Sequence, residues 1–262
     1  MLFRSPPILI TALFLLMAGF MAGAMNAVAG GGSFVSFPAL VAAGVPAVAA
    51  NASSTVALVP GTLASAWAYT TGPHRVGLTG FGGLAFRDLL GASVAGGLAG
   101  AVLLLSTPGA TFDAVIPWLL LAATIVFAFG RRIGVALRRR LRLGRRTALA
   151  VQFVLGVYGG YFGGAVGLMM MAAWMLLDAA DLKAMNPART LLTSAMNIVA
   201  VLCFVLAGKV WWPQALCVLV GAATGGYVGA RIGQRLPPVM VRAVVTLVTV
   251  GMTVVFFVRA YG

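Results

Sequence analysis

Ten apolar segments follow one another along this chain, and they constrain its fold more than any other feature. They cover roughly residues 8–28, 34–43, 46–71, 84–106, 112–130, 147–162, 165–177, 188–207, 211–230 and 239–259. Most of them are close to the ~20 residues that an α-helix needs to cross the hydrocarbon core of a bilayer. Hydrophobic residues make up 61% of the chain and charged residues only 8%, so too few polar side chains remain to cover a water-soluble domain. The sequence therefore predicts an all-α polytopic membrane protein.

The basic residues are concentrated in one stretch. The chain has 18 Lys and Arg against 4 Asp and Glu, which gives a formal net charge of +14. Half of residues 131–146 are Arg, and this stretch lies between long apolar segments. Cytoplasmic loops of membrane proteins collect Lys and Arg, so we interpret 131–146 as a basic cytoplasmic linker. Nucleic acid is not expected as a partner.

Few side chains in the sequence suit catalysis or metal binding. There is no Glu, His74 is the single histidine, and Cys203 and Cys217 lie in apolar stretches. The four acidic residues are Asp88, Asp113, Asp178 and Asp181. This inventory offers no carboxylate pair within a span, no Ser-His-Asp triad and no His-based metal site. We therefore expect no enzyme activity, no catalytic residue, no metal site and no cofactor.

The two halves of the chain share motifs in the same order. Asn51 and Thr55 in the first half correspond to Asn186 and Thr190 in the second half at a constant separation. Further along, two glycine motifs correspond at a slightly shorter separation, and both predict close helix packing: Gly96-Gly97-x-x-Gly100 and Gly225-Gly226-x-x-Gly229. Internal repeats are typical of secondary transporters. The sequence predicts a first transmembrane repeat in 1–130, the linker in 131–146 and a second transmembrane repeat in 147–262.

Two of the apolar segments, 34–43 and 165–177, are too short to span a bilayer. Each follows a glycine-rich break, at residues 26–33 and 159–164 respectively. Non-helical backbone at membrane depth occurs only where it is buried in protein or lines a cavity. We interpret each break as the tip of a re-entrant hairpin near the midplane of the membrane. A tight turn at the membrane surface is the alternative.

The positions of the basic residues distinguish two topologies. If 8–28 and 147–162 both cross fully, the chain has eight spans, both termini lie inside, and 13 of the 18 basic residues are cytoplasmic. If each half is one hairpin plus three crossings, the halves are inverted repeats, both termini lie outside, and 15 are cytoplasmic. The second arrangement obeys the positive-inside rule better, and it also places Trp118, Trp211 and Trp212 near the outer interface. We favour inverted repeats, with eight full spans as the alternative.

A polar stripe runs along the segment that follows each hairpin. In the second half its members share one helical face: Asn186, Arg189, Thr190, Thr193, Ser194 and Asn197. The first half repeats the spacing, interrupted by Leu58, with Asn51, Ser54, Thr55, Thr62 and Ser65. Small polar residues also hydrogen-bond membrane helices to one another, which is the competing interpretation. Two matched stripes, each beside a glycine-rich break, favour a polar cavity.

Arg189 indicates which ligand such a cavity would bind. A guanidinium presents forked donors that fit an oxyanion, although an Arg at this position can also extend to the membrane surface. Backbone N–H groups and helix N-termini at the hairpin tips attract anions as well. The candidate substrate-binding residues are Asn26, Gly30, Gly31, Gly32, Ser33, Asn51, Ser54, Thr55, Gly163, Gly164, Gly167, Asn186, Arg189 and Thr190.

Several of these motifs resemble one known family. Residues 22–33, followed by Phe37-Pro38-Ala39-Leu40, resemble the first-half signature of the sulfite exporter TauE/SafE family. The second half is similar in its glycine-rich residues 159–167, its helix with Asn186 and Thr190, and its run over 229–238. The resemblance covers nearly the whole chain. Residues 165–169 depart from it because no Pro-Ala-Leu-like segment is present there, which bears on the substrate more than on the fold.

The resemblance implies a multi-pass permease of the bacterial inner membrane for a small sulfur oxyanion or organosulfonate, such as sulfite or sulfoacetate. Export is the direction we expect, by a secondary transporter or facilitator. The expected partners are the lipid bilayer and the small anionic substrate, and a homodimer is compatible with the sequence. The alternatives are a permease for another small anion, a non-transporting membrane partner or assembly protein, and, least compatible with the residue inventory, a membrane enzyme.

Overall fold

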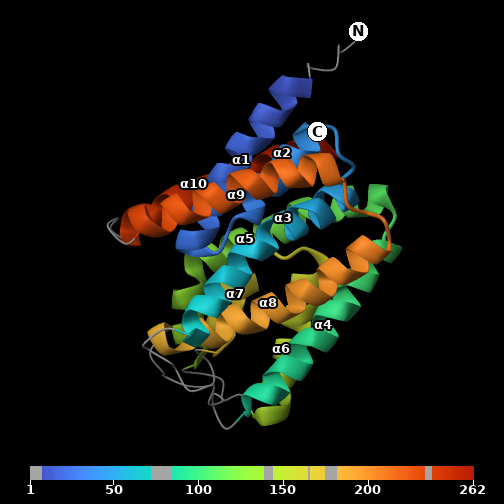
Figure 1. Ribbon diagram of the computed structural model, residues 1–262. Helices are drawn as coiled ribbons and strands as arrows, with labels where there is room; N and C mark the ends of the chain where they lie inside the picture. The colour runs from blue at the N-terminus through green and yellow to red at the C-terminus, as the bar shows by residue number, and fades with distance from the viewer. Residues whose placement is uncertain (1–7, 72–83, 139–143, 165, 175–181, 234–237) are drawn as a thin grey trace.

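The computed structural model describes residues 8–71, 84–138, 144–164, 166–174, 182–233 and 238–262. These ranges form ten α-helices and no strand, so the all-α prediction is confirmed. The first half contains α1 (Ile8–Ala29), α2 (Ser33–Ala42), α3 (Ala47–Thr71), α4 (Phe86–Ser106) and α5 (Gly109–Arg138). The second half contains α6 (Arg145–Tyr161), α7 (Val166–Trp174), α8 (Leu182–Leu206), α9 (Trp212–Gly233) and α10 (Pro238–Tyr261) (Figure 1).

The outer surface of the helices is apolar. Helices α1, α3, α4, α5 and α8 are each long and apolar enough to cross a membrane, counting only the described residues. Large apolar side chains lie exposed along the helices, among them Ile8 at 90%, Leu206 at 87% and Leu247 at 75% exposure. In water such a surface would be strongly unfavourable, whereas lipid tails solvate it. The chain is a multi-pass membrane protein.

A glycine in the left-handed backbone region follows the first helix of each half, α1 and α6, within two residues of its end. Gly30 has φ 74° and Gly163 has φ 76°, a conformation that costs a residue with a Cβ free energy and that glycine adopts readily. The amide of Gly30 donates to the carbonyl of Asn26, and that of Gly163 to the carbonyl of Tyr158. After each glycine the chain turns into a short helix, α2 or α7. These are the two short segments that the sequence predicts.

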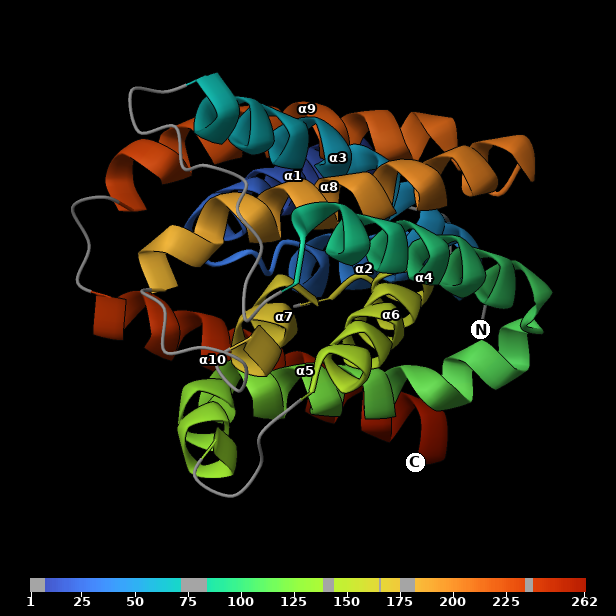
Figure 2. The same ribbon diagram turned by 90° about the horizontal axis from the view of Figure 1, so that it is seen from below.

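The helices of the two halves pack in an exchanged order. Helix α1 packs against α9 of the other half, and its counterpart α6 packs against α4. In the same way α2 contacts α10 while α7 contacts α5, and α3 and α8 contact each other (Figure 2). Exchanging the halves therefore reproduces this set of contacts, as expected if they are structural repeats.

Glycines make the two closest interfaces between the halves. A Cβ on Gly229 of α9 would lie 2.5 Å from the Cα of Ala24 on α1, and a Cβ on Gly156 of α6 would lie 3.0 Å from the Cα of Gly96 on α4. Backbones that approach this closely leave no room for a side chain, which is how small residues hold membrane helices together. The prediction of close packing at both glycine motifs is confirmed.

The hairpins open toward opposite sides of the molecule. Helix α1 begins and α10 ends on the side that also carries the α4–α5 and α8–α9 connections (Figures 1 and 2). The pair α1–α2 opens toward this side, and the pair α6–α7 opens toward the other (Figure 2). Inverted repeats require this arrangement. Which side faces the cytoplasm stays a prediction.

Candidate functional site

The two glycine breaks meet at a polar cavity of about 120 Å³, to which Gly30 and Gly163 both contribute. A cavity of roughly 10–15 Å³ holds one water molecule, so this one has room for a small ion with several waters. Fourteen residues line it. They come from both halves: Asn26, Ala27, Gly30, Ser33, Thr55, Leu58, Thr62, Gly163, Val166, Gly167, Arg189, Thr190, Thr193 and Asn197.

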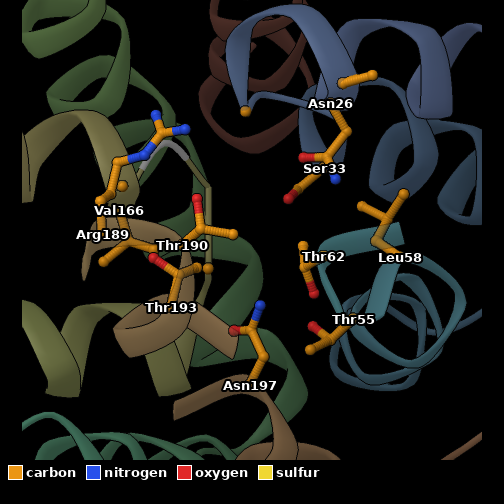
Figure 3. A pocket seen from close by; sticks show the side chains of 14 residues that line it. Asn26, Ser33, Thr55, Leu58, Thr62, Val166, Arg189, Thr190, Thr193 and Asn197 are labelled. Atoms are coloured by element: carbon orange, nitrogen blue, oxygen red, sulfur yellow. The ribbon is translucent and has the colours of Figure 1, made fainter. Parts of the chain in front are cut away.

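Two central helices form opposite walls of the cavity (Figure 3). Helix α3 contributes Thr55, Leu58 and Thr62, and α8 contributes four residues from one helical face. Positions three, four and seven residues apart lie on the same side of a helix, so these members of the two polar stripes face the cavity. The α8 residues are Arg189, Thr190, Thr193 and Asn197.

The side chain of Arg189 lies between the two hairpin breaks. A Cβ at Gly30 would be 3.8 Å from Arg189 Nη1, and a Cβ at Gly167 would be 3.3 Å from Arg189 Cδ. The first distance is an ordinary van der Waals contact, whereas the second is tight, so of the two glycines Gly167 is the one whose missing side chain leaves room for Arg189. Arg189 is the one charged residue among the fourteen described residues of the lining, so the lining itself contributes a positive charge and no negative one.

Both short helices begin at the cavity. Ser33 is the first residue of α2 and Val166 is the first residue of α7, and both line the cavity. The N-terminus of a helix carries a partial positive charge and presents backbone N–H groups that lack an intrahelical acceptor. In α2 the amides of residues 34–36 already donate to the carbonyls of Gly31 and Gly32, so what this terminus adds to the charge of Arg189 is the dipole of the helix. The arrangement therefore suits a small anion.

Eight of the fourteen predicted site residues line the cavity: Asn26, Gly30, Ser33, Thr55, Gly163, Gly167, Arg189 and Thr190. Five lie outside the lining: Gly31, Gly32, Asn51, Ser54 and Gly164. The side chain of Asn186 is outside the described residues. The predicted set omits six of the lining residues. Three of them, Thr62, Thr193 and Asn197, belong to the polar stripes, so their helical spacing could have identified them. Ala27, Leu58 and Val166 are apolar, and nothing in the sequence marks them.

Asn51 and Ser54 hold the hairpins in place. The Asn51 side-chain amide donates to the carbonyl oxygen of Tyr161 over 2.9 Å, and the hydroxyls of Ser54 and Ser36 lie 2.6 Å apart. The first bond fixes α3 to the end of α6, and the second fixes α3 to α2. For these two residues the structure shows interhelical hydrogen bonding, so we interpret them as positioning residues.

Metal binding is not suggested by the described part of the chain. There, His, Cys, Asp and Glu side chains form no group of three that could hold a metal ion. The chemistry of the cavity is that of hydroxyls, amides, backbone N–H groups and one guanidinium.

Comparison with known proteins identifies relatives over nearly the full chain. The model of the family described as "Sulfite exporter TauE/SafE" matches residues 15–256. A protein of Escherichia coli strain K12 named "Probable membrane transporter protein YfcA" is 27% identical over all of this chain and 94% of its own length. A "Probable membrane transporter protein" of Haemophilus influenzae is 26% identical over 90% of both chains. No solved structure matches the chain significantly.

Proposed function

The chain belongs to the sulfite exporter TauE/SafE family, and from this membership we propose that it is a secondary transporter that exports a small sulfur-containing anion across the inner membrane. Membrane transport is supported by the names of the relatives from E. coli and H. influenzae. Sulfite and small organosulfonates are the substrates we propose, because the family description names sulfite.

The observation that carries this proposal is the position of Arg189 between the two hairpin breaks. Its guanidinium lies next to Gly30 of one half and Gly167 of the other, in a cavity whose described lining has no acidic residue. A planar guanidinium can donate two parallel hydrogen bonds to an oxyanion. The beginnings of α2 and α7 supply further attraction for negative charge.

The location of the cavity between the halves supports alternating access. Its lining combines residues of α1, α2 and α3 with residues of α7 and α8, and with Gly163 from the break between α6 and α7. A movement of one half relative to the other would open the cavity first to one side and then to the other. A negative cell interior favours the exit of an anion by about 2.3 kcal/mol per charge for each 100 mV, so the potential alone can drive export.

The test is anion flux through purified protein in liposomes. Sulfite, sulfate, thiosulfate and a small sulfonate are loaded separately, and a membrane potential of known sign is imposed with potassium and valinomycin. We expect flux of one or two sulfur anions, with a direction that reverses when the potential is reversed. Arg189→Gln should abolish this flux, whereas Arg259→Gln, which removes the same charge at the exposed end of α10, should not.

Each contrary result has its own meaning. Flux of nitrate or phosphate in place of the sulfur anions would identify a permease for another small anion. Absence of all flux from folded protein, together with co-purification of one fixed partner, would favour a non-transporting assembly protein. Flux that persists in Arg189→Gln would place the anion site elsewhere.

A further inference from the structure

The two walls of the cavity differ in their hydrogen-bonding chemistry. On α3, the hydroxyl of Thr55 donates to the carbonyl oxygen of Asn51 over 2.9 Å, and that of Thr62 donates to the carbonyl oxygen of Val59 over 2.9 Å. A hydroxyl carries a single proton. With that proton donated within the helix, each of these oxygens presents lone pairs to the cavity and acts as an acceptor there.

The α8 wall carries the donors of Arg189 and Asn197, together with one acceptor, because the hydroxyl of Thr193 donates to Met170 Sδ over 3.7 Å. Arg189 has donors only, and Figure 3 shows the amide nitrogen of Asn197 on the side of that residue that faces Thr55 and Thr62 across the cavity. The other end of this amide, Asn197 Oδ1, is buried and has no hydrogen-bond partner among the described residues. A buried acceptor without a partner is unfavourable in a folded protein, so Asn197 Oδ1 suits a ligand group that donates a hydrogen bond.

We propose that the bound anion itself carries a hydrogen-bond donor, which it directs at Thr55 and Thr62 of α3 while its negative oxygens face Arg189 and Asn197 of α8. This rests on the proposed function and narrows its substrate class. A fully deprotonated oxyanion has acceptors on every side and would place lone pairs against the lone pairs of the two threonines. Hydrogen sulfite, or a sulfonate that bears a hydroxyl or amino group, satisfies both walls. Thr55 and Thr62 are then specificity-determining residues.

A bare cation at the α3 wall is the weaker interpretation. Its positive charge would enter the same cavity of about 120 Å³ that Arg189 lines. Two positive charges within one small cavity of low dielectric repel each other. An O–H or N–H group of the anion meets the acceptors without adding a full positive charge.

The experiment compares 2-hydroxyethanesulfonate with ethanesulfonate, which differ by one hydroxyl group. Binding of each to the purified full-length protein is measured by calorimetry, with sulfite as a reference and in both sodium and choline salts. We expect wild type to bind the hydroxylated sulfonate about fivefold to tenfold more tightly, as one net hydrogen bond provides. In Thr55→Val that ratio should fall toward one while ethanesulfonate still binds. Thr55→Ser should restore it because the acceptor oxygen is restored.

A matched control comes from α9. The hydroxyl of Thr224 donates to the carbonyl of Val220 over 3.1 Å, the same bond type as that of Thr55, but on an exposed face outside the cavity. Thr224→Val should therefore leave the ratio at the wild-type value. Retained binding of ethanesulfonate shows that each variant is folded.

Other results would overturn the proposal. The proposal is contradicted if wild type binds the two sulfonates equally. It is also contradicted if the preference for the hydroxylated sulfonate survives in both Thr55→Val and Thr62→Val, because the α3 threonines would then not accept a hydrogen bond from the anion. Neither result contradicts the proposed function as an anion transporter. If binding requires sodium and shows no preference for the hydroxylated sulfonate, the threonines of α3 bind a cation instead, which also contradicts the proposal. Binding of sulfite with neither sulfonate, at an affinity that Thr55→Val and Thr62→Val leave unchanged, also refutes the proposal, because hydrogen sulfite would then make no use of the α3 wall. Failure of all three anions to bind would refute the proposed function as well.

Discussion

Asn51 of α3 donates its side-chain amide to the backbone carbonyl of Tyr161, the last residue of α6, over 2.9 Å. Three residues later, Ser54 lies within hydrogen-bond distance of Ser36 on α2, at 2.6 Å. One turn of α3 thus contacts the short helix of the first hairpin and the entry to the break of the second. The relative position of the two breaks, and with it the shape of the cavity, depends on this turn.

Replacement of Asn51 by Leu should therefore disturb both stability and transport. Asn51 is 2% exposed, so its loss leaves the Tyr161 carbonyl buried without a partner, which costs about 1–3 kcal/mol. We expect a lower Tm in detergent together with reduced flux. Ser106→Ala, which removes an exposed hydroxyl that bonds within α4, is the control and should change neither. A wild-type Tm for Asn51→Leu would mean that this bond is dispensable.

Arg189→Lys tests the geometry of the cation apart from its charge. Lys keeps the positive charge but offers no planar fork for an oxyanion. A hydrogen bond to a charged group contributes about 1.5–3 kcal/mol, so we expect anion affinity to fall roughly tenfold to a hundredfold. Calorimetry with sulfite measures this. Affinity equal to wild type in both Arg189→Lys and Arg189→Gln would indicate that the side chain does not contact the anion.

Gly163→Ala should destabilise the second hairpin. A left-handed conformation costs a residue with a Cβ about 1–2 kcal/mol, and Gly163 has φ 76°. The comparison is Gly91→Ala in α4, where an added Cβ would meet no atom within 4 Å and alanine favours helix by up to about 1 kcal/mol. In thermal unfolding, the Tm of Gly163→Ala should therefore be lower than that of wild type, and the Tm of Gly91→Ala should be equal to or higher than that of wild type. The reverse order would contradict the assigned backbone of the break.

The ion pair between Asp88 and Arg145 should contribute little to the stability of the folded protein. Its N–O distance is 2.7 Å, but the two side chains are 23% and 63% exposed. Pairs as accessible as this one contribute about 0–1 kcal/mol, and less at high salt. Asp88→Asn should thus lower Tm slightly at low ionic strength and not at all in concentrated salt. A large, salt-independent loss would show that Asp88 has a structural role beyond this pair.

The orientation of the chain can be decided with reporter fusions. If the halves are inverted repeats with the basic linker in the cytoplasm, the C-terminus at Gly262 lies outside. Alkaline phosphatase fused after Gly262 should then be active, and green fluorescent protein at the same place should be dark. The opposite pair of results would place both termini in the cytoplasm and reject the inverted orientation.

Much of this architecture could be predicted from the sequence. Apolar length marks the long helices, and glycine-rich breaks mark the hairpins because few other residues tolerate such backbone. Helical spacing brings Thr55 and Thr190 to the cavity, since residues on one face stay together. Helical spacing alone could not show that Thr55 lines the cavity while Asn51 and Ser54 do not, because all three lie at neighbouring positions of one helix. Only the partner helices decide which of them faces the cavity and which bonds to Tyr161 or Ser36.

The exchanged packing was likewise beyond the sequence. The glycine motif of α4 predicts a close neighbour, and so does that of α9, but neither motif specifies which helix that is. The structure places α6 against the first and α1 against the second.

This exchange has a consequence for how the protein is made. The glycine face that receives α1 is on α9, so roughly 180 residues of chain are synthesised between a helix and its main partner. During that time α1 remains in the lipid without α9, and α3 is the helix of the first half that contacts its hairpin. A first half produced alone would have no α9, so the face of α1 that α9 covers would remain exposed to lipid.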